Sequence, residues 1–135
     1  IFDLRDYIEQ NYVTLSGGEK QRVQLARALA QIWSDDYCDK LLILDEPTSY
    51  LDIKHQYALF DFLKELNKKG LTIMMVLHDL NHAISNSNKI ILLKNSKLIS
   101  FGETSTIINN DLINKVFEID LKLINYDGMD NPIIY

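Results

Sequence analysis

The sequence predicts an α/β fold, and three observations support that class. Two short, continuous apolar runs, 41–44 and 71–77, have the length of buried strands. Between them, residues 53–67 repeat apolar side chains at helical spacing. Strand, helix and strand in this order are typical of a mostly parallel sheet with flanking helices. We therefore expect both runs to be fully buried strands.

The segment before the first strand should be helical. Residues 2–9 are typical of the end of a helix, and residues 11–15 interrupt it. Ser16 then stands at a helix N-cap with Glu19 three residues later, the pattern of a capping box. The helix that follows should run from about 18 to 33. Its apolar residues fall on more than one side, so we expect it to be well buried.

The rest of the chain reads as short elements, with no repeat, low-complexity linker or domain boundary. Cations and a glycine at 68–70 should end the central helix. In chain order the later elements are a short helix at 79–86, strands at 89–93 and 98–101 around a turn at 94–97, one or two short helices within 103–117, and a final pair of strands at 119–124 and 132–135 around a turn at 127–128.

Composition narrows the class of protein. The 135 residues are the size of one modest domain, and 47% hydrophobic with 24% charged residues is ordinary for a soluble globular protein. A net charge of -5 without a basic run argues against nucleic-acid binding. A single cysteine, Cys38, excludes a disulfide within the chain and fits a reducing cytoplasm. No signal peptide is evident, and no apolar stretch approaches the ~20 residues of a membrane span, so membrane association should need a partner.

The first motif, LSGGEKQR at 15–22, has features of a phosphate-binding loop. Gly17 and Gly18 would let the backbone approach a phosphate closely, and Ser16 adds a hydroxyl. A helix start also presents backbone N–H groups and a positive dipole end. An ordinary capped helix after a glycine turn would explain Ser16 and Glu19, but not the whole run from 15 to 30.

The second motif is the carboxylate pair Asp45-Glu46 at the end of the first apolar run. Ligands of α/β sheets bind at the carboxyl ends of strands. Adjacent strand residues point to opposite faces, so the two carboxylates should have different roles. One could face Mg²⁺ and the other could activate an attacking water. A solvated loop start is the alternative, but the continuation Pro47-Thr48-Ser49 and Leu51-Asp52 speaks against it.

The second apolar run ends in His78. A lone histidine at a strand end is most often a capping or core residue. His78 and His82 are four residues apart, like the histidines of a zinc HExxH motif, but Asp79 stands where glutamate is needed and no third ligand is evident. We expect His55 to be a surface residue.

Taken in order, these motifs resemble those of ABC-type ATPases. LSGGEKQR looks like the signature motif, LLILDEPTS at 41–49 like the Walker B strand, and DEPTS-x-LD like Walker B continuing into the D-loop. The resemblance covers about 12–135 and implies the C-terminal part of a P-loop NTPase domain with a C-terminal hairpin. The end of the helical subdomain and the signature helix would occupy about 1–34, and Walker B, D-loop, H-loop and C-terminal strands about 35–135.

The resemblance also implies roles for individual residues. Glu46 would be the general base and His78 the switch histidine that senses the γ-phosphate, while Asp45 would hold Mg²⁺. ATP contacts would come from Ser16, Gly17, Gly18, Glu19, Ser49 and Asp52. In such ATPases the signature loop contacts ATP on the opposite subunit of a head-to-tail homodimer.

Within this family the chain is similar to ATP-binding subunits of importers for haem, iron-siderophore and cobalamin. The segment His78-Asp79-Leu80-Asn81 is typical of that branch, and residues 23–33 and 51–56 look most like hemin import proteins. The expected protein is a peripheral ATPase on the cytoplasmic face of the bacterial inner membrane. It would power a transmembrane permease dimer without touching the cargo.

Three alternatives to a hemin importer remain open. One is an iron-siderophore or cobalamin import ATPase, and another is a truncated module that supplies only the signature loop. The third is an ABC-type ATPase acting on DNA or ribosomes, against which the HDLN segment, the acidic balance and the lack of a heptad run argue.

Two features depart from the family pattern. Tyr50 occupies a D-loop position where a small residue is commoner. More seriously, no GxxxxGK[ST] phosphate loop, the Walker A motif, occurs in the chain, which also begins with Ile rather than Met. We therefore expect a fragment that binds ATP very weakly and hydrolyses none by itself. An unpaired apolar strand edge should also make it poorly soluble.

Overall fold

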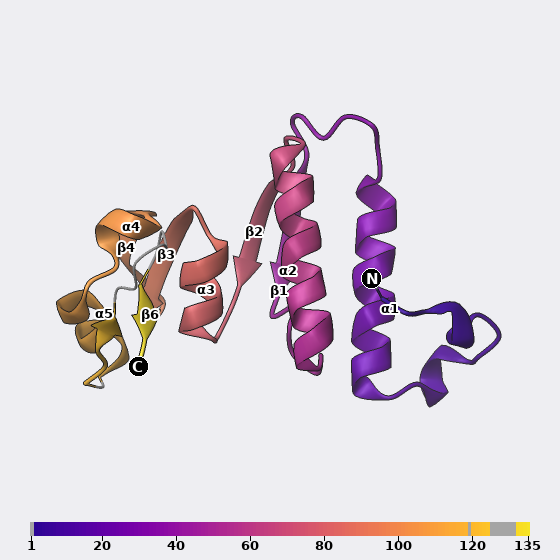
Figure 1. Cartoon of the computed structure of the whole chain (residues 1–135), viewed down its shortest axis with the longest axis horizontal. Coiled ribbons are helices and arrows are strands. Elements are labelled where there is room, and N and C mark those ends of the chain that lie inside the picture. The colour runs from indigo at the N-terminus through magenta and orange to yellow at the C-terminus, as the bar shows by residue number, and fades with distance from the viewer. Residues whose placement is uncertain (1, 119, 125–131) are drawn as a thin grey trace. The chain divides into compact units, whose positions relative to one another are not determined.

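The computed structural model describes residues 2–118, 120–124 and 132–135. The chain forms two compact units, Ile1–Leu77 and His78–Tyr135, which are described separately below. The boundary, at 77–78, lies just after a strand. The residues around it include neither glycine nor proline. Figure 1 labels the elements along the chain.

The first long helix, α1, spans Gly17–Ile32, close to the predicted 18–33. The predicted capping box is present, with Ser16 as N-cap. Only Leu25 and Leu29 of this helix are buried. The prediction of a well-buried helix was therefore wrong, because α1 contributes a single stripe to the hydrophobic cluster of the first unit.

The segment before α1 contains two 3₁₀ turns, η1 (Arg5–Tyr7) and η2 (Tyr12–Thr14), instead of the expected end of an α-helix. The side chain of Asn11 caps η2 by accepting a hydrogen bond from the backbone N–H of Val13 at 3.1 Å. Asparagine side chains compete with helical hydrogen bonds in this way, and so favour short turns.

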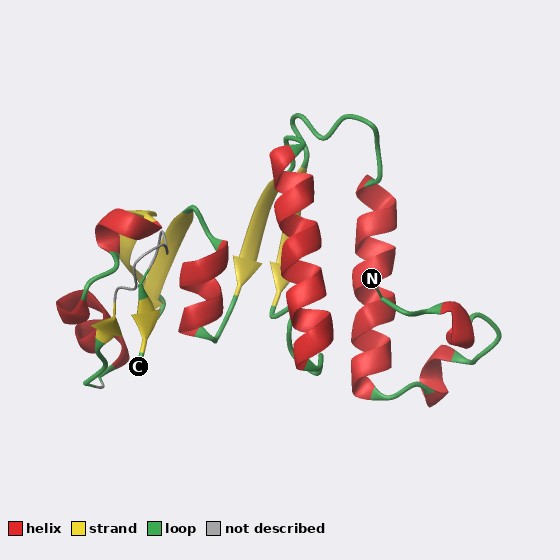
Figure 2. Ribbon diagram, in the orientation of Figure 1, coloured by secondary structure: helices red, strands yellow, loops and turns green. Residues whose placement is uncertain are grey.

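The predicted strand–helix–strand unit is confirmed. Strands β1 (Leu41–Asp45) and β2 (Thr72–Val76) pair in parallel, with Leu41 opposite Thr72 and Asp45 opposite Val76. Helix α2 (Ile53–Lys68) connects them, as Figure 2 shows. Buried leucines from the helices and strands form one cluster on the covered face of this pair, namely Leu25, Leu29, Leu42, Leu44, Leu59, Leu63 and Leu66.

The opposite face of β1 and β2 is exposed. Its apolar side chains, Leu41, Ile43, Met74 and Val76, leave between 47% and 63% of their surface accessible. The expectation of strands buried on both sides was therefore wrong for the part of the chain that the structure describes. Continuous apolar runs indicate burial on both faces, but only one face of this pair is covered by the described residues.

The second unit matches the predicted series of short elements. These are α3 (Leu80–Asn86), β3 (Lys89–Lys94), β4 (Lys97–Glu103), α4 (Thr104–Ile107), α5 (Asn110–Phe117), β5 (Leu123–Ile124) and β6 (Ile133–Ile134). The turn between β3 and β4 is tighter than predicted, because Asn95 and Ser96 both have positive φ, 49° and 59°. A two-residue turn with two positive φ angles matches the twist of an antiparallel pair.

The α/β class is confirmed, with less parallel pairing than expected. Of the three strand pairs in the described residues, β1–β2 is parallel, whereas β3–β4 and β5–β6 are antiparallel. A two-residue connection, as between β3 and β4, permits only antiparallel pairing. The expected turn at 127–128 and the start of the strand expected at 119 lie outside the described residues. No helix in the described ranges is long and apolar enough to cross a membrane.

Candidate functional site

The signature-like loop forms the start of α1. The Oγ of Ser16 accepts from the N–H of Glu19 at 3.4 Å, and the carboxylate of Glu19 accepts from the N–H of Ser16 at 2.7 Å. The bond from the backbone N–H of Ser16 is the main reason why the pKa of the Glu19 carboxyl is lowered. The carboxylate of Glu19 therefore serves the helix cap. Ser16 and Gly17 are exposed at this positive helix end, a position that suits a phosphate group.

The loop that follows β1 packs directly against this helix start. A Cβ atom on Gly18 would lie 2.6 Å from the backbone carbonyl oxygen of Tyr50, and a Cβ on Gly17 would lie 3.5 Å from its ring. Gly18 is therefore required by close approach. Tyr50, which the sequence marked only as a departure, is the residue that makes this contact.

A second link joins α1 to the same loop. The side-chain amide of Gln21 points at the carbonyl oxygens of Glu46 and Pro47, at 3.5 Å and 3.4 Å. These distances are at the outer limit of hydrogen bonding, so each contact is weak. Sequence analysis included Gln21 in the motif at 15–22 but gave it no role, because a polar residue in the first turns of a helix gives no distinctive signal.

Glu46 adopts a strained backbone conformation directly after β1. Its φ is 43°, in the left-handed region, while its N–H still donates to the carbonyl of Val76 at 3.0 Å. A non-glycine residue in this region costs about 1–3 kcal/mol and is frequent at functional sites. The Oγ of Ser49 donates to the Glu46 carboxylate at 3.0 Å, which fixes the orientation of that exposed carboxylate.

Asp45, the last residue of β1, is also exposed. Within the described ranges no group of three or more His, Cys, Asp or Glu side chains is arranged to hold a metal ion. A single carboxylate still fits Mg²⁺, which keeps several waters and takes further ligands from substrate phosphates. The residues present therefore suit a metal that arrives with a nucleotide.

Asp52 is the N-cap of α2, and its carboxylate accepts from the N–H of His55 at 2.9 Å. This backbone bond is the main reason why the pKa of Asp52 lies below its usual value. The Nδ1 of His55 is 2.8 Å from the same carboxylate oxygen, and its Nε2 is 3.4 Å from Asp3. Because the His55 side chain is only 11% exposed, the expectation of a surface histidine was wrong.

His78 belongs to the second unit, where it is exposed and precedes the N-cap of α3. The capping role falls to Asp79, whose carboxylate accepts from the N–H of His82 at 2.9 Å.

The contacts of Gly18 and Gln21 described above bring Ser16, Gly17 and Gly18 together, within the first unit, with the loop that carries Glu46 and Ser49.

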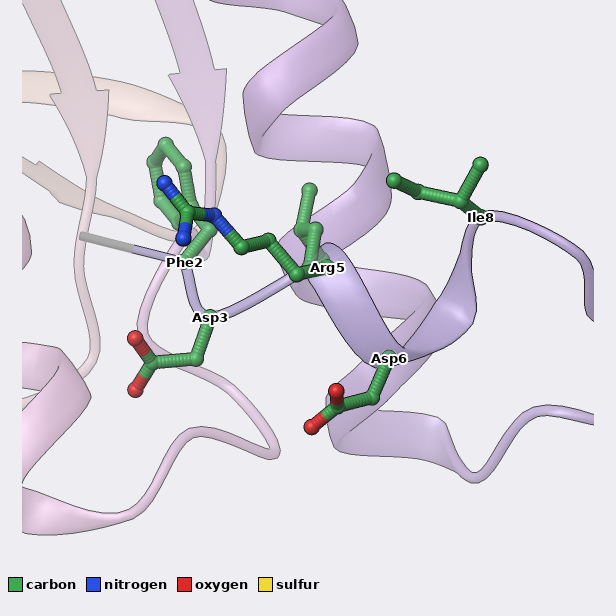
Figure 3. Close-up of a pocket in the computed structure, with 6 residues that line it drawn as sticks. Phe2, Asp3, Arg5, Asp6 and Ile8 are labelled. Carbon is green, nitrogen blue, oxygen red and sulfur yellow. The ribbon is translucent and has the colours of Figure 1, made fainter.

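A shallow hollow near the start of the chain is lined by Phe2, Asp3, Leu4, Arg5, Asp6 and Ile8 (Figure 3). It contains none of the candidate residues. One short, continuous segment forms it, and no chemistry converges there.

Comparisons with known proteins agree with these motifs. Residues 2–49 match the family model described as "ABC transporter". The chain is 38% identical over 127 residues to the hemin import ATP-binding protein HmuV of Hahella chejuensis, covering 93% of this chain and 50% of HmuV. It is 40% identical over 131 residues to the iron(3+)-hydroxamate import ATP-binding protein FhuC of Bacillus subtilis, covering 96% of this chain and 46% of FhuC. The chain thus spans about half the length of the curated relatives it matches.

Solved structures share the fold. A metal-chelate type ABC transporter in an inward-facing conformation matches with a TM-score of 0.71 and 26% identity, over 99% of this chain and 52% of its own. The dimeric ATP-binding cassette MJ0796, bound to ADP and Pi in a post-hydrolysis state, matches with a TM-score of 0.59 and 35% identity, over 68% and 37%.

Proposed function

We propose that this chain, which belongs to the ABC transporter family of ATP-binding proteins, is part of the ATP-hydrolysing subunit of a bacterial importer for hemin. Two relatives that cover more than nine-tenths of the chain are named as a hemin and an iron(3+)-hydroxamate import protein. An iron siderophore is therefore the first alternative cargo, and cobalamin is the second.

The observation that carries the proposal is the packing of Gly17 and Gly18, at the start of α1, against the ring and the backbone carbonyl oxygen of Tyr50. This contact joins a helix start suited to phosphate with the loop that bears an oriented carboxylate, Glu46. Phosphoryl transfer needs phosphate binding and an oriented base more than it needs covalent chemistry, since its catalysis is mainly positioning and charge stabilisation. In a head-to-tail dimer the two features of one chain would serve different nucleotides.

In this mechanism Glu46 accepts a proton from the water that attacks the γ-phosphate, and Ser49 holds its carboxylate in place. His78 would contact the γ-phosphate, as the switch histidine does in the ATPases that the motifs resemble. Asp45 would provide one oxygen ligand to Mg²⁺, and the metal would neutralise phosphate charge when bound with ATP.

The signature loop acts on a second nucleotide. Ser16, Gly17 and Gly18 bind the γ-phosphate of ATP held by the other subunit of a head-to-tail homodimer, while Glu19 shapes the loop through its cap. Asp52 fixes the start of α2 beside the Tyr50 segment. The MJ0796 cassette, a dimer bound to ADP and Pi, supports this assembly.

The remaining partners follow from the importer function. The dimer would dock on a transmembrane permease at the cytoplasmic face of the inner membrane, with no contact to the cargo and no nucleic-acid ligand. The exposed face of Leu41, Ile43, Met74 and Val76 would be covered by the rest of a longer subunit, consistent with relatives twice as long. Because the sequence has no GxxxxGK[ST], the 135 residues alone would hydrolyse no ATP.

A second candidate is a module that supplies only the signature loop to a partner. Reading the gene upstream of Ile1 separates the two. An open frame encoding GxxxxGK[ST] favours the hydrolytic subunit, and a stop codon favours the module.

The importer function itself is tested by reconstituting the complete subunit with the permease encoded beside it. We expect hemin, presented with its binding protein, to stimulate ATP hydrolysis more than an iron siderophore or cobalamin does. Stimulation by one of the other ligands would reassign the cargo, and a gene without a neighbouring permease would contradict the importer function.

A further inference from the structure

Asn81 makes two hydrogen bonds to the backbone of one residue at the other end of the second unit. Its Oδ1 accepts from the N–H of Ile134 at 2.7 Å, and its Nδ2 donates to the carbonyl oxygen of Ile134 at 3.1 Å. A carboxamide offers the same acceptor and donor as a peptide group. Asn81 thus pairs with β6 as a neighbouring strand would, and Figure 1 shows α3 beside that strand.

The hydrogen-bond pattern of the β5–β6 pair explains why the backbone N–H and C=O of Ile134 are available to Asn81. Lys122 and Tyr135 exchange both of their backbone hydrogen bonds, at 3.2 Å and 2.9 Å. The next pair, Leu123 and Ile134, is therefore the non-hydrogen-bonded pair, whose N–H and C=O groups point outward. Asn81 satisfies both outward groups of Ile134.

Two more asparagines accept hydrogen bonds from β5 and from the residues just before it. The N–H of Leu123 donates to the Oδ1 of Asn110 at 2.8 Å, and the N–H of Leu121 donates to the Oδ1 of Asn114 at 2.9 Å. Four residues of helix α5 rise about 6 Å, close to the length of two residues of strand. The spacing of Asn110 and Asn114 therefore matches alternate N–H groups of the strand.

These contacts attach the terminal hairpin to two helices. Two strands this short are not stable in water by themselves. Leu121, Leu123 and Ile134 also pack against the buried cluster that contains Ile84 of α3. The hairpin and α3 therefore depend on each other, with Asn81 as the polar link between them.

Helix α3 needs such support because it has only seven residues, far fewer than an isolated helix needs for stability. Its N-cap is Asp79, which is bonded directly to His78 along the chain. Any shift of the start of α3 must therefore move the backbone of His78.

We propose that Asn81 is a positioning residue for His78, acting through the terminal hairpin that it holds against α3. The role rests on the proposed ATPase function, in which His78 contacts the γ-phosphate. Asn81 touches no substrate; it fixes the helix whose first residues set the place of the histidine. The hairpin formed by β5 and β6 is then part of the catalytic framework.

The test is a double-mutant cycle in the complete subunit, with kcat and KM for ATP as readouts. One change is Asn81→Ala and the other is truncation after residue 131, which removes β6. Each alone should lower kcat by up to about 10²-fold, the cost of displacing a catalytic group by about 1 Å, with KM changed less than twofold. The combination should lower kcat no further than truncation alone. The matched control is Asn88→Ala, an exposed asparagine in the same unit, which should keep wild-type values.

A second substitution of Asn81 and an NMR measurement separate a positioning role from a loss of folding. If Asn81→Ala does not fold, Asn81→Asp keeps an acceptor for the N–H of Ile134 and should give an intermediate kcat. In NMR spectra the imidazole signals of His78 should shift in either variant, while those of His55 stay in place.

Wild-type kcat in Asn81→Ala, or effects that multiply in the double variant, would overturn the role of Asn81. An inactive wild-type subunit would instead overturn the proposed ATPase function itself.

Discussion

Replacing Gly18 with alanine tests the contact between the start of α1 and the loop after β1. The new Cβ would lie 2.6 Å from the carbonyl oxygen of Tyr50, whereas ordinary contact begins at 3.4 Å. The two segments would have to separate by about 0.8 Å, the difference between these distances. The obstructing atom belongs to the backbone, so no side-chain rotation relieves the clash. Overpacking of this kind costs about 1–3 kcal/mol of folding free energy.

Gly17→Ala is the matched control. A Cβ there would lie 3.5 Å from the Tyr50 ring, within ordinary contact, and alanine favours a helix over glycine by up to about 1 kcal/mol. Urea unfolding should therefore show a midpoint about 1 M lower for Gly18→Ala, given slopes of about 1–3 kcal/mol per M, and an unchanged or higher midpoint for Gly17→Ala. Equal midpoints for the two variants would refute the close approach as the reason for Gly18.

Three other predictions follow from the same contacts. Ser16→Ala removes a helix cap and should cost about 1 kcal/mol in urea unfolding, while Ser16→Thr should restore most of it; no loss in the alanine variant would contradict the capping role. The lowered pKa of Asp52 means that its stabilising effect is complete above the usual aspartate pKa and is lost as pH falls through the lowered value. Below about pH 4 the urea midpoint of Asp52→Asn should therefore fall less steeply with pH than that of the wild type. The same pH dependence in both proteins would contradict this linkage. Ile43→Ser with Met74→Ser should raise the solubility of the 135-residue chain but destabilise the complete subunit by about 2–5 kcal/mol, as for truncated core residues. Equal stability of the complete subunit with and without these changes would show that this face stays exposed.

Local structure was the part of the fold that the sequence predicted best. Capping residues, helical spacing and turn signals act over a few residues, so the ends of α1 and α2 and the turn at Asn95-Ser96 could be placed from the residues alone. Burial was predicted less well, because it depends on what covers each face. The apolar runs of β1 and β2 indicated two covered faces, and the described residues cover one.

For the candidate site, the motifs identified residues but not the contacts between them. No spacing rule predicts that the carbonyl of Tyr50 meets Gly18, because residues 32 positions apart are brought together by the packing of α1 on the first unit. The environment of His55 and the link from Asn81 to Ile134 were missed for the same reason. Both depend on partners about 50 residues away in the sequence.

ATP hydrolysis by the complete subunit, compared with the 135-residue chain and with Glu46→Gln, tests the central claim most directly. We expect Mg²⁺-dependent hydrolysis by the subunit, none by the chain, and a loss of about 10²–10⁴-fold in kcat when the general base is replaced, with ATP binding retained. Hydrolysis by the chain alone that disappears in Glu46→Gln would show that no further phosphate loop is needed. Hydrolysis that survives Glu46→Gln unchanged would contradict the catalytic role assigned to this carboxylate.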